Sequence, residues 1–399
     1  MAELVIERVI LVINAGSSSV KYQLLSLPSG KVWLDGQISG LGAANCQHRY
    51  QSGASVHETA MPDADHAAAL TALFDLWSQR SLPVPVAVGH RVVHGGEVFT
   101  QPTRMNAENL ARLEALDRLA PLHNPVNRLG IVIAHQYFSD IPHLAVFDTA
   151  FHATLPDMAF RYAVPEAWYQ QYGIRRYGFH GTAHAAALAQ VSAYLNQPRQ
   201  ALNLITLQLG NGASACAIQQ GRSVDTSMGF TPLEGLVMGT RCGDLDPAIP
   251  GHLMRLAELS ADVVDHQLNH GSGLQGLCGD ADMRRVCARA MQQDEEAERA
   301  LAVYCYRVQK YIGAYWAVMG GIDALVFSGG VGEHSAMLRA RICAPLAHLG
   351  VAVDARRNAQ TLASVAEINP PDRPGAKVLV VQVDEQRAIA EAVQDWLLA

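Results

Sequence analysis

The sequence predicts an α/β protein with two duplicated domains, and three observations support that prediction. Apolar runs typical of strands, such as residues 143–148, alternate with segments of helical periodicity, such as residues 295–318. A strand, a small-residue turn and a returning strand occur near the start of each half of the chain. The length of 399 residues is enough for two or three domains, each with its own core.

The first half begins with a predicted hairpin. Apolar residues run over 9–13, the small residues NAGSSS occupy 14–19, and the apolar run VKYQLL follows. Two such runs around a small-residue turn are typical of paired strands. The strand HLAVFD at 143–148 closes this half, so we place the domain boundary near residue 150.

The second half repeats this opening. LITLQL (204–209) runs into GNGAS (210–214), and apolar residues resume in ACAI. One repeated hairpin only supports a duplication and does not establish it. The other predicted elements are helices over 184–195, 295–318 and 336–343, strands over 323–330 and 377–383, and a last helix over 385–398 that crosses back to the first domain.

Composition and charge exclude several classes of protein. Apolar residues make up 49% of the chain, too much for disorder. The 30 basic and 37 acidic residues give a net charge of −7 without a basic stripe, so no nucleic-acid partner is expected. No stretch reaches the ~18 apolar residues of a membrane span, and no membrane partner is expected. The seven cysteines are scattered without a CxxC pair, which favours free thiols and a cytoplasmic location.

Three small-residue turns are candidate phosphate sites. NAGSSSVK places backbone N–H groups and hydroxyls ahead of Lys21, although a plain hairpin has the same composition. LGNGASA matches the GxGxxA fingerprint of NAD-dependent dehydrogenases, but that fingerprint opens a helix and a strand follows here. SGGVGEHS leads into the helix predicted at 336–343, whose free N–H groups favour a phosphate or a ribose. Three such turns in one chain are stronger evidence than any one of them.

Two histidine pairs raise the alternative of a zinc hydrolase. HRVVH (90–94) and HGTAH (180–184) each space two imidazoles four residues apart. The first segment is predicted to be a strand, and the second lacks the glutamate that a zinc hydrolase uses as its base. Zinc is therefore the weaker interpretation.

Arginines and one aspartate suggest an anion clamp. Arg91 ends a buried-looking strand, Arg241 lies in a glycine-rich loop, and Arg175 and Arg176 precede YGFH. Asp148 ends a strand, at the edge where α/β proteins bind ligands. Each arginine alone is typical of a surface or an ion pair, but together they fit recognition of a carboxylate or phosphate.

Eight motifs in order resemble the acetate and propionate kinases across nearly the whole chain. They are NAGSSSVKYQLL, GHRVVHGGEVF, APLHNPVN, VFDTAFHATLP, RRYGFHGT, LGNGAS, SVDTSMGFTPLEGLVMGTR and FSGGVGE. The resemblance implies an actin-like fold of two RNase H-like domains with ATP in the cleft, usually as a homodimer. It implies an acyl-substrate and phosphate domain at 1–150, with 384–399 packing back on it, and a nucleotide-binding domain at 151–383.

The resemblance also implies an activity: Mg²⁺- and ATP-dependent phosphorylation of acetate to acetyl phosphate and ADP, with Mn²⁺ as an alternative metal. A propionate kinase and a non-catalytic actin-like nucleotide-binding protein stay open as alternatives. The presence of both Arg91 and Arg241 argues against the second. Propionate-preferring relatives tend to have alanine where Val93 stands, so we expect acetate to be preferred.

The resemblance assigns residues to four roles. The catalytic positions are Asp148, His180 and Arg241, and the metal ligands are Asn14 and Glu385. Arg91 would bind the substrate carboxylate, and an apolar pocket would consist of Val93, Leu122, Phe179 and Pro232. The ATP-binding residues would be Lys21, Gln208, Leu209, Gly210, Asn211, Gly212, Asp282, Met283, Arg284, Gly329, Gly330, Val331, Gly332 and Glu333.

The implied chemistry explains these residue types. Acetate is ionised at pH 7 and needs no base, but its charge must approach a triphosphate, so neutralisation is the main task of the site. Arginine, histidine and the metal serve that task during in-line transfer. Asp148 has no evident proton to transfer, and we expect it to orient an arginine or a metal-bound water.

Several positions depart from the family motifs. Gln208 replaces a histidine before LGNG, Ala183 and Cys242 each replace a serine, and His334 replaces an asparagine. Near the end, DEQRAIA stands in place of NEELVIA and keeps Glu385. A neutral amide cannot donate as an imidazolium does, so Gln208 is the departure expected to lower turnover.

Overall fold

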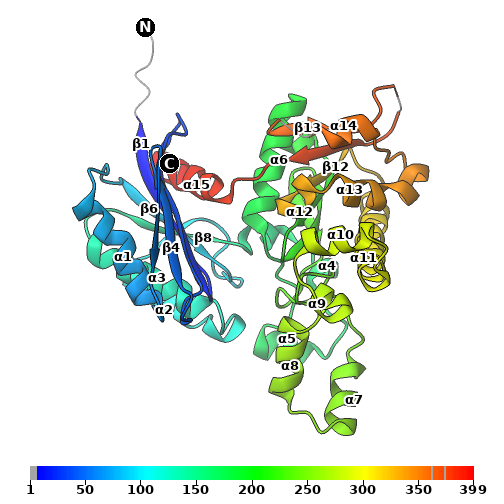
Figure 1. The fold of residues 1–399 in the computed structure, drawn as a ribbon, viewed down its shortest axis with the longest axis horizontal. Coiled ribbons are helices and arrows are strands. Elements are labelled where there is room, and N and C mark those ends of the chain that lie inside the picture. Colours follow the sequence, from blue (N-terminus) through cyan, green and yellow to red (C-terminus); the bar gives the residue numbers. More distant parts are fainter. Residues whose placement is uncertain (1–6, 361–362, 373) are drawn as a thin grey trace. The chain divides into compact units, whose positions relative to one another are not determined.

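The computed structural model describes residues 7–360, 363–372 and 374–399. The chain divides into two compact units. The first holds the residues up to Ala150 together with Asp384–Ala399, and the second is Phe151–Val383. Each unit contains one β-sheet with helices packed on it (Figure 1), so the predicted α/β class is confirmed.

The sheet of the first unit has the strand order β5-β4-β3-β2-β1-β6-β8-β7. The predicted hairpin is β1–β2, an antiparallel pair, while β6 and β8 continue the sheet parallel to β1. The strands are β1 (Arg8–Ala15), β2 (Ser19–Leu27), β3 (Val32–Ser39), β4 (Gln47–Ser52), β5 (Ser55–Ala60), β6 (Ala87–Val92), β7 (Thr103–Arg104) and β8 (His143–Phe147).

Helices cover both faces of this sheet, because alternate side chains of β1 point in opposite directions. Leu11 and Ile13 pack in a core with the first helices, while Ile10 and Val12 pack with the last helix, α15. The helices of this unit are α1 (His66–Gln79), α2 (Ala107–Glu114), the 3₁₀ turn η1 (Asp117–Leu119), α3 (Asn124–Tyr137) and α15 (Glu385–Leu398).

The sheet of the second unit has the order β11-β10-β9-β12-β14-β13. Its hairpin is β9–β10, and β12 and β14 follow parallel to β9. The strands are β9 (Leu204–Leu209), β10 (Ala213–Gln219), β11 (Arg222–Thr226), β12 (Ala324–Ser328), β13 (Val365–Glu367) and β14 (Lys377–Val381).

The two sheets share a five-stranded core. In the first unit β3-β2-β1 are antiparallel and β1-β6-β8 are parallel; in the second, β11-β10-β9 and β9-β12-β14 repeat this order and these directions. The duplication therefore extends well beyond the hairpin that signals it in the sequence.

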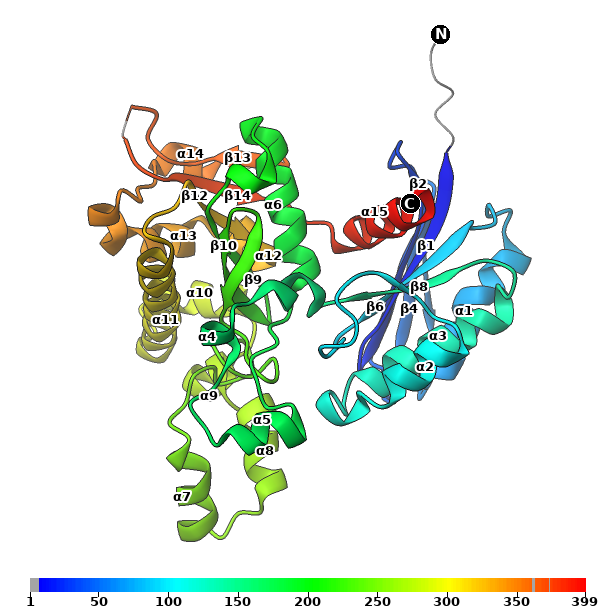
Figure 2. The ribbon, with the colours of Figure 1, turned by 180° about the vertical axis from the view of Figure 1, so that it is seen from behind.

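Helices α6 (Gly181–Leu195) and α11 (Glu295–Met319) lie on opposite faces of the second sheet (Figure 2). The other elements of this unit are η2 (Ala150–Thr154), α4 (Asp157–Phe160), α5 (Glu166–Tyr172), η3 (Arg199–Ala201), α7 (Ala248–Leu256), α8 (Ala261–His270), α9 (Gly273–Cys278), α10 (Met283–Met291), α12 (Gly329–His334), α13 (Ala336–Cys343), η4 (Ala344–Leu349) and α14 (Ala355–Ala359).

One glycine-rich turn differs from expectation. SGGVGEHS was expected to be a turn ahead of a helix at 336–343, but residues 329–334 already form α12, and α13 follows after Ser335. LGNGAS continues into β10 as expected, so the dinucleotide fingerprint lacks its helix. In the described residues we find no helix with the length and apolar character that crossing a bilayer requires.

Candidate active site

Arg91 and Asp148 form a two-pronged ion pair in the first unit. Arg91 lies near the end of β6 and Asp148 directly follows β8, so neighbouring parallel strands bring them to one edge of the sheet. Nε and Nη2 of Arg91 donate to the two carboxylate oxygens at 2.9 and 2.6 Å. Burial alone would lower the pKa of Arg91, but the charges of Asp148 and Glu385 raise it above its ordinary value. Arg91 is therefore a fixed cation.

The two expected metal ligands lie beside Arg91. Nη1 of Arg91 donates to Oδ1 of Asn14 at 3.4 Å, and Nε lies 3.9 Å from a carboxylate oxygen of Glu385, the first residue of α15. Lys21 is opposite Asn14 in the β1–β2 ladder. Burial raises the pKa of Glu385, and the nearby Arg91 opposes that effect. Five expected site residues of the first unit thus form one charged cluster.

The expected apolar residues of the first unit differ in setting. Val93 is half-buried, and its backbone N–H donates to Oδ1 of Asn127, which also holds the carbonyl of Ala15 through its amide. Leu122 lies ahead of α3 and is 59% exposed. Val93 is therefore tied to the hairpin that carries Asn14, whereas Leu122 is open to solvent in this structure. The other two pocket residues, Phe179 and Pro232, belong to the second unit.

In the second unit, His180 and Arg241 meet at the turn of the β9–β10 hairpin. A Cβ atom added to Gly212 would come within 2.9 Å of Nη2 of Arg241 and 3.6 Å of Nε2 of His180. His180 has φ +58°, a left-handed conformation that is uncommon for a residue with a side chain and tends to occur at functional sites. An arginine and a histidine therefore flank the glycine turn predicted to bind phosphate.

Arg241 is a half-buried cation held by a carbonyl. Its Nη1 donates to the backbone oxygen of Pro232 at 2.6 Å, and among the described residues no carboxylate forms an ion pair with it. Burial lowers the pKa of Arg241. A guanidinium without a counter-charge is a favourable place for an anionic ligand.

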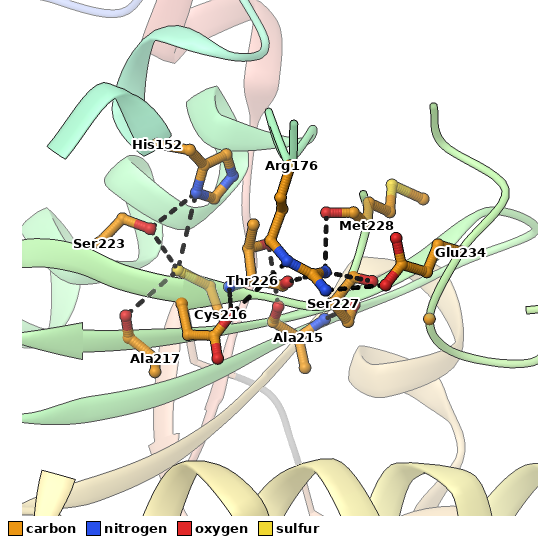
Figure 3. A network of polar contacts seen from close by, with 12 residues as sticks. His152, Arg176, Ala215, Cys216, Ala217, Ser223, Thr226, Ser227, Met228 and Glu234 are labelled. Atoms are coloured by element: carbon orange, nitrogen blue, oxygen red, sulfur yellow. Dashed lines mark hydrogen bonds and ion pairs between the residues drawn. The ribbon is translucent and has the colours of Figure 1, made fainter. Parts of the chain in front are cut away.

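The backbone beside His180 is fixed by His152. Nε2 of His152 donates to the carbonyl of Phe179 at 3.0 Å, so its Nδ1 accepts the hydroxyl proton of Ser223 at 2.8 Å (Figure 3). Burial lowers the pKa of His152 to about 4, so the ring is neutral. This histidine, in the motif HATLP, was not singled out in the sequence.

The structure gives Arg176 a different role from the expected anion clamp. Its Nη1 donates to the carbonyl of Thr226 at 2.7 Å, and its Nη2 pairs with Glu234 at 2.7 Å (Figure 3). Its guanidinium is thus engaged in holding the loop that leads to Arg241. Arg175 is buried and stacks on the ring of Phe160 at 3.7 Å.

A pocket of about 610 Å³ opens next to the hairpin turn. Its wall includes many expected ATP-binding residues: Gly210, Asn211, Asp282, Met283, Arg284, Gly330 and Val331. Sequence reasoning missed several others: Gly239, Leu274, Ala281, Arg285, Cys287, His334 and Ser335. The signal for one of them was present, because His334 departs from a recognised motif.

The other expected nucleotide residues of the second unit lie at the ends of β9 and β12 and in α12. Gly329 has φ +74°, and an added Cβ would lie 2.6 Å from the carbonyl of Leu209, so only glycine lets the two turns approach this closely. The N–H of Gly329 donates to the carboxylate of Glu333 at 3.0 Å. The Ser328 hydroxyl donates to Oε1 of Gln208 at 2.7 Å. This bond connects the unusual glutamine of β9 to the residue directly ahead of α12.

The histidine pairs do not form a zinc site. His90 is on β6 and bonds to His143, while both ring nitrogens of His184 are bonded to the hydroxyls of Thr206 and Ser214. Among the described residues there is no group of three or more His, Cys, Asp or Glu side chains that could hold a metal.

Comparisons with known proteins show the family of the chain. The model of the acetokinase family matches residues 9–391. The chain is 46% identical over 386 residues to the acetate kinase of Clavibacter michiganensis subsp. michiganensis, covering 96% of this chain and 97% of that protein. It is 47% identical over 388 residues to the acetate kinase of Streptomyces avermitilis, covering 96% of each.

Two solved structures have the same fold. A propionate kinase from Francisella tularensis subsp. tularensis superposes with a TM-score of 0.92 at 38% identity, covering 97% of this chain and 99% of that one. The acetate kinase of Porphyromonas gingivalis has a TM-score of 0.91 at 36% identity, with coverage of 98% and 100%.

Proposed function

The chain belongs to the acetokinase family, and from that premise we propose that it transfers the γ-phosphoryl group of ATP to acetate, giving acetyl phosphate and ADP. The observation that carries the proposal is that two arginines, Arg91 and Arg241, can each accept an anionic ligand. Arg91 binds Asp148 through Nε and Nη2 and Asn14 through Nη1, and its two terminal nitrogens carry further N–H groups that can meet an anion. Arg241 has no carboxylate partner among the described residues. Both suit the binding of anions.

Arg91 is proposed to hold the acetate carboxylate. Asp148 takes the edge of the guanidinium between Nε and Nη2, and Nη1 makes a long contact of 3.4 Å with Asn14. The acetate carboxylate is proposed to accept from the further N–H groups of Nη1 and Nη2. The pair also fixes the plane of the guanidinium before the substrate arrives. We propose Val93, Leu122, Phe179 and Pro232 as the apolar surroundings of the acyl group, with acetate preferred over propionate.

His180 and Arg241 are proposed to stabilise the phosphoryl group during transfer. They flank Gly212, next to the turn whose backbone is proposed to approach the phosphates. In the loose transition state of phosphoryl transfer, charge builds on the equatorial oxygens, and preorganised donors lower the barrier. The pocket lined by Asp282, Met283 and Gly330 is proposed to hold the nucleoside.

The residues proposed to hold Mg²⁺ fit that ion. Asn14 and Glu385 supply hard oxygen donors, and their shared contacts with Arg91 place them in one small region. Mg²⁺ is usually held by one or two protein carboxylates or amides, with substrate phosphates and water as further ligands. When bound, the ion would neutralise phosphate charge. Cytoplasmic location and a homodimer are parts of the same proposal.

The test is to trap the product. The purified protein is incubated with ATP and Mg²⁺ and with acetate, propionate or butyrate in turn, and acyl phosphate is captured with hydroxylamine. We expect acyl hydroxamate from acetate above all, and none without ATP or Mg²⁺. Arg91→Ala and Arg241→Ala should each lose roughly 3–4 kcal/mol of transition-state stabilisation, while the corresponding lysine variants recover part of it. Activity within a few-fold of the parent in either alanine variant would contradict the role of that arginine.

A further inference from the structure

We propose that Thr206, Ser214 and His184 are positioning residues that hold His180 as a neutral imidazole with its proton on Nε2. The inference rests on the proposed function, because it concerns how His180 donates to the transferred phosphoryl group. It differs from a role as imidazolium, in which the charge of the ring would be needed. Its basis is a chain of three hydrogen bonds inside the second unit.

The chain links β9, α6 and β10. Oγ1 of Thr206 lies 2.7 Å from Nδ1 of His184, Nε2 of His184 lies 2.8 Å from Oγ of Ser214, and the same Oγ lies 2.9 Å from Nδ1 of His180. Thr206, His184 and Ser214 have no exposed surface. Each bond must therefore be satisfied inside the protein.

The direction of the chain follows from its buried end. Among the described residues, the acceptor that the Thr206 hydroxyl reaches is Nδ1 of His184, so Thr206 donates its proton to that nitrogen. Burial holds the pKa of His184 well below its ordinary value, so the ring is neutral and its single proton is on Nε2. That proton is donated to Ser214, whose own hydroxyl proton is left for Nδ1 of His180.

A His180 ring that accepts at Nδ1 carries its proton on Nε2. Nε2 is also the atom that faces Gly212 and Arg241, the side of the proposed phosphate site. Protonating Nδ1 would leave a buried hydroxyl proton without an acceptor, either that of Ser214 or, if the bonds reverse, that of Thr206, which is costly. The ring thus donates one hydrogen bond through Nε2 without becoming charged.

The groups around the ring reinforce this state. Arg241, on the loop that follows β11, brings a positive charge near Nε2, which disfavours a second cation. From the segment before α4, the neutral ring of His152 meets His184 edge to face, at 5.7 Å between ring centres. Arg241 thus brings a positive charge to the Nε2 side, while the ring facing His184 is uncharged.

The direct test is the protonation of His180 itself, observed by ¹⁵N NMR of histidine-labelled protein without ligand, with the signal assigned by its loss in His180→Gln. In the parent protein we expect Nε2–H and an unprotonated Nδ1, unchanged as pH falls through ~6.5, where a free imidazole titrates. In Ser214→Ala, Nδ1 should take up a proton near that pH. A parent ring with its proton on Nδ1, or the same titration in both proteins, would overturn the proposal.

Two further variants separate positioning from packing. Ser26→Ala removes a buried hydroxyl that serves Trp33 in the first unit, so it is the matched control and should leave the His180 signals unchanged. Thr206→Val removes the first donor of the chain with little change in volume, and it serves if Ser214→Ala does not fold. We expect Ser214→Ala to lower kcat at least tenfold and Ser26→Ala less than threefold; equal losses would contradict the positioning role. Failure of the parent to form acyl phosphate would refute the function and leave the NMR result standing.

Discussion

Replacing Asp148 by asparagine distinguishes an orienting role from a proton-transfer role. The carboxylate accepts two hydrogen bonds from Arg91, at 2.9 and 2.6 Å. An asparagine amide keeps one acceptor oxygen but presents N–H groups to the other donor, so one of the two bonds is lost. A hydrogen bond to a charged group contributes about 1.5–3 kcal/mol, and at 1.36 kcal/mol per tenfold the expected loss in kcat/KM for acetate is about 10- to 160-fold.

The assay measures initial rates at saturating ATP over a range of acetate concentrations. If Asp148 orients Arg91, KM for acetate should rise in Asp148→Asn while KM for ATP stays near that of the parent. Asp117→Asn is a matched control, because Asp117 pairs with Arg128 at 3.0 Å away from the charged cluster. Its kinetics should not change.

Asp148→Ala should in addition lower stability. It leaves the mostly buried Arg91 without its main partner, and breaking a buried pair in this way costs about 3–5 kcal/mol. Urea unfolding measures that loss. The orienting role is refuted if Asp148→Asn lowers kcat at an unchanged KM for acetate and also removes one limb of the pH–rate profile, since that result is typical of proton transfer.

Three further changes test other parts of the site. Val93→Ala should shift the ratio of kcat/KM values toward propionate, since one methylene in an apolar pocket contributes ~1–3 kcal/mol; an unchanged ratio in a folded variant removes Val93 from the pocket. Gln208→His should raise turnover if the amide bonded to Ser328 is a handicap, and no gain would mean that the site has adapted to glutamine. Burial lowers the pKa of His143 to about 4, so below pH ~6.5 the unfolded chain binds a proton that the folded protein does not. The free energy of unfolding, measured with urea, should therefore fall by about 2 kcal/mol from pH 7 to pH 5 because of this ring. Equal stability at both pH values would mean that the ring is not held neutral.

Sequence patterns predicted the framework of the fold because apolar periodicity reports directly on it. The hairpins at β1–β2 and β9–β10 have continuous apolar runs on both sides of a small-residue turn, and both form as expected. The start of α12 was missed, since three glycines in six residues resemble a turn. Ser328, which directly precedes α12, donates to the carbonyl of Leu207 on the neighbouring strand, and local propensity does not record such a tertiary bond.

Buried polar partners were harder to predict. Arg176 and Glu234 are 58 residues apart, and nothing in their local sequence indicates that they pair. His152, His184 and Ser214 lie among apolar neighbours and are recognisable as partners only once the strands and α6 are folded together. Motif resemblance identified the residues proposed to touch the ligands, whereas the residues that orient them emerged from the hydrogen bonds.

The helix α15 packs on the first unit but is the last element of the protein to be synthesised. Ile389, Ala390 and Val393 of this helix bury one apolar face of the first sheet, and a Cβ on Gly89 of β6 would lie 2.9 Å from Ile389. On the ribosome, α15 emerges only after all 233 residues of the second unit, Phe151–Val383, have been made. Until then the first sheet presents an uncovered apolar face, which is a site for aggregation or chaperone binding. A nascent chain stalled just before Asp384 would therefore be expected to hold a folded second unit and a first unit prone to misassembly.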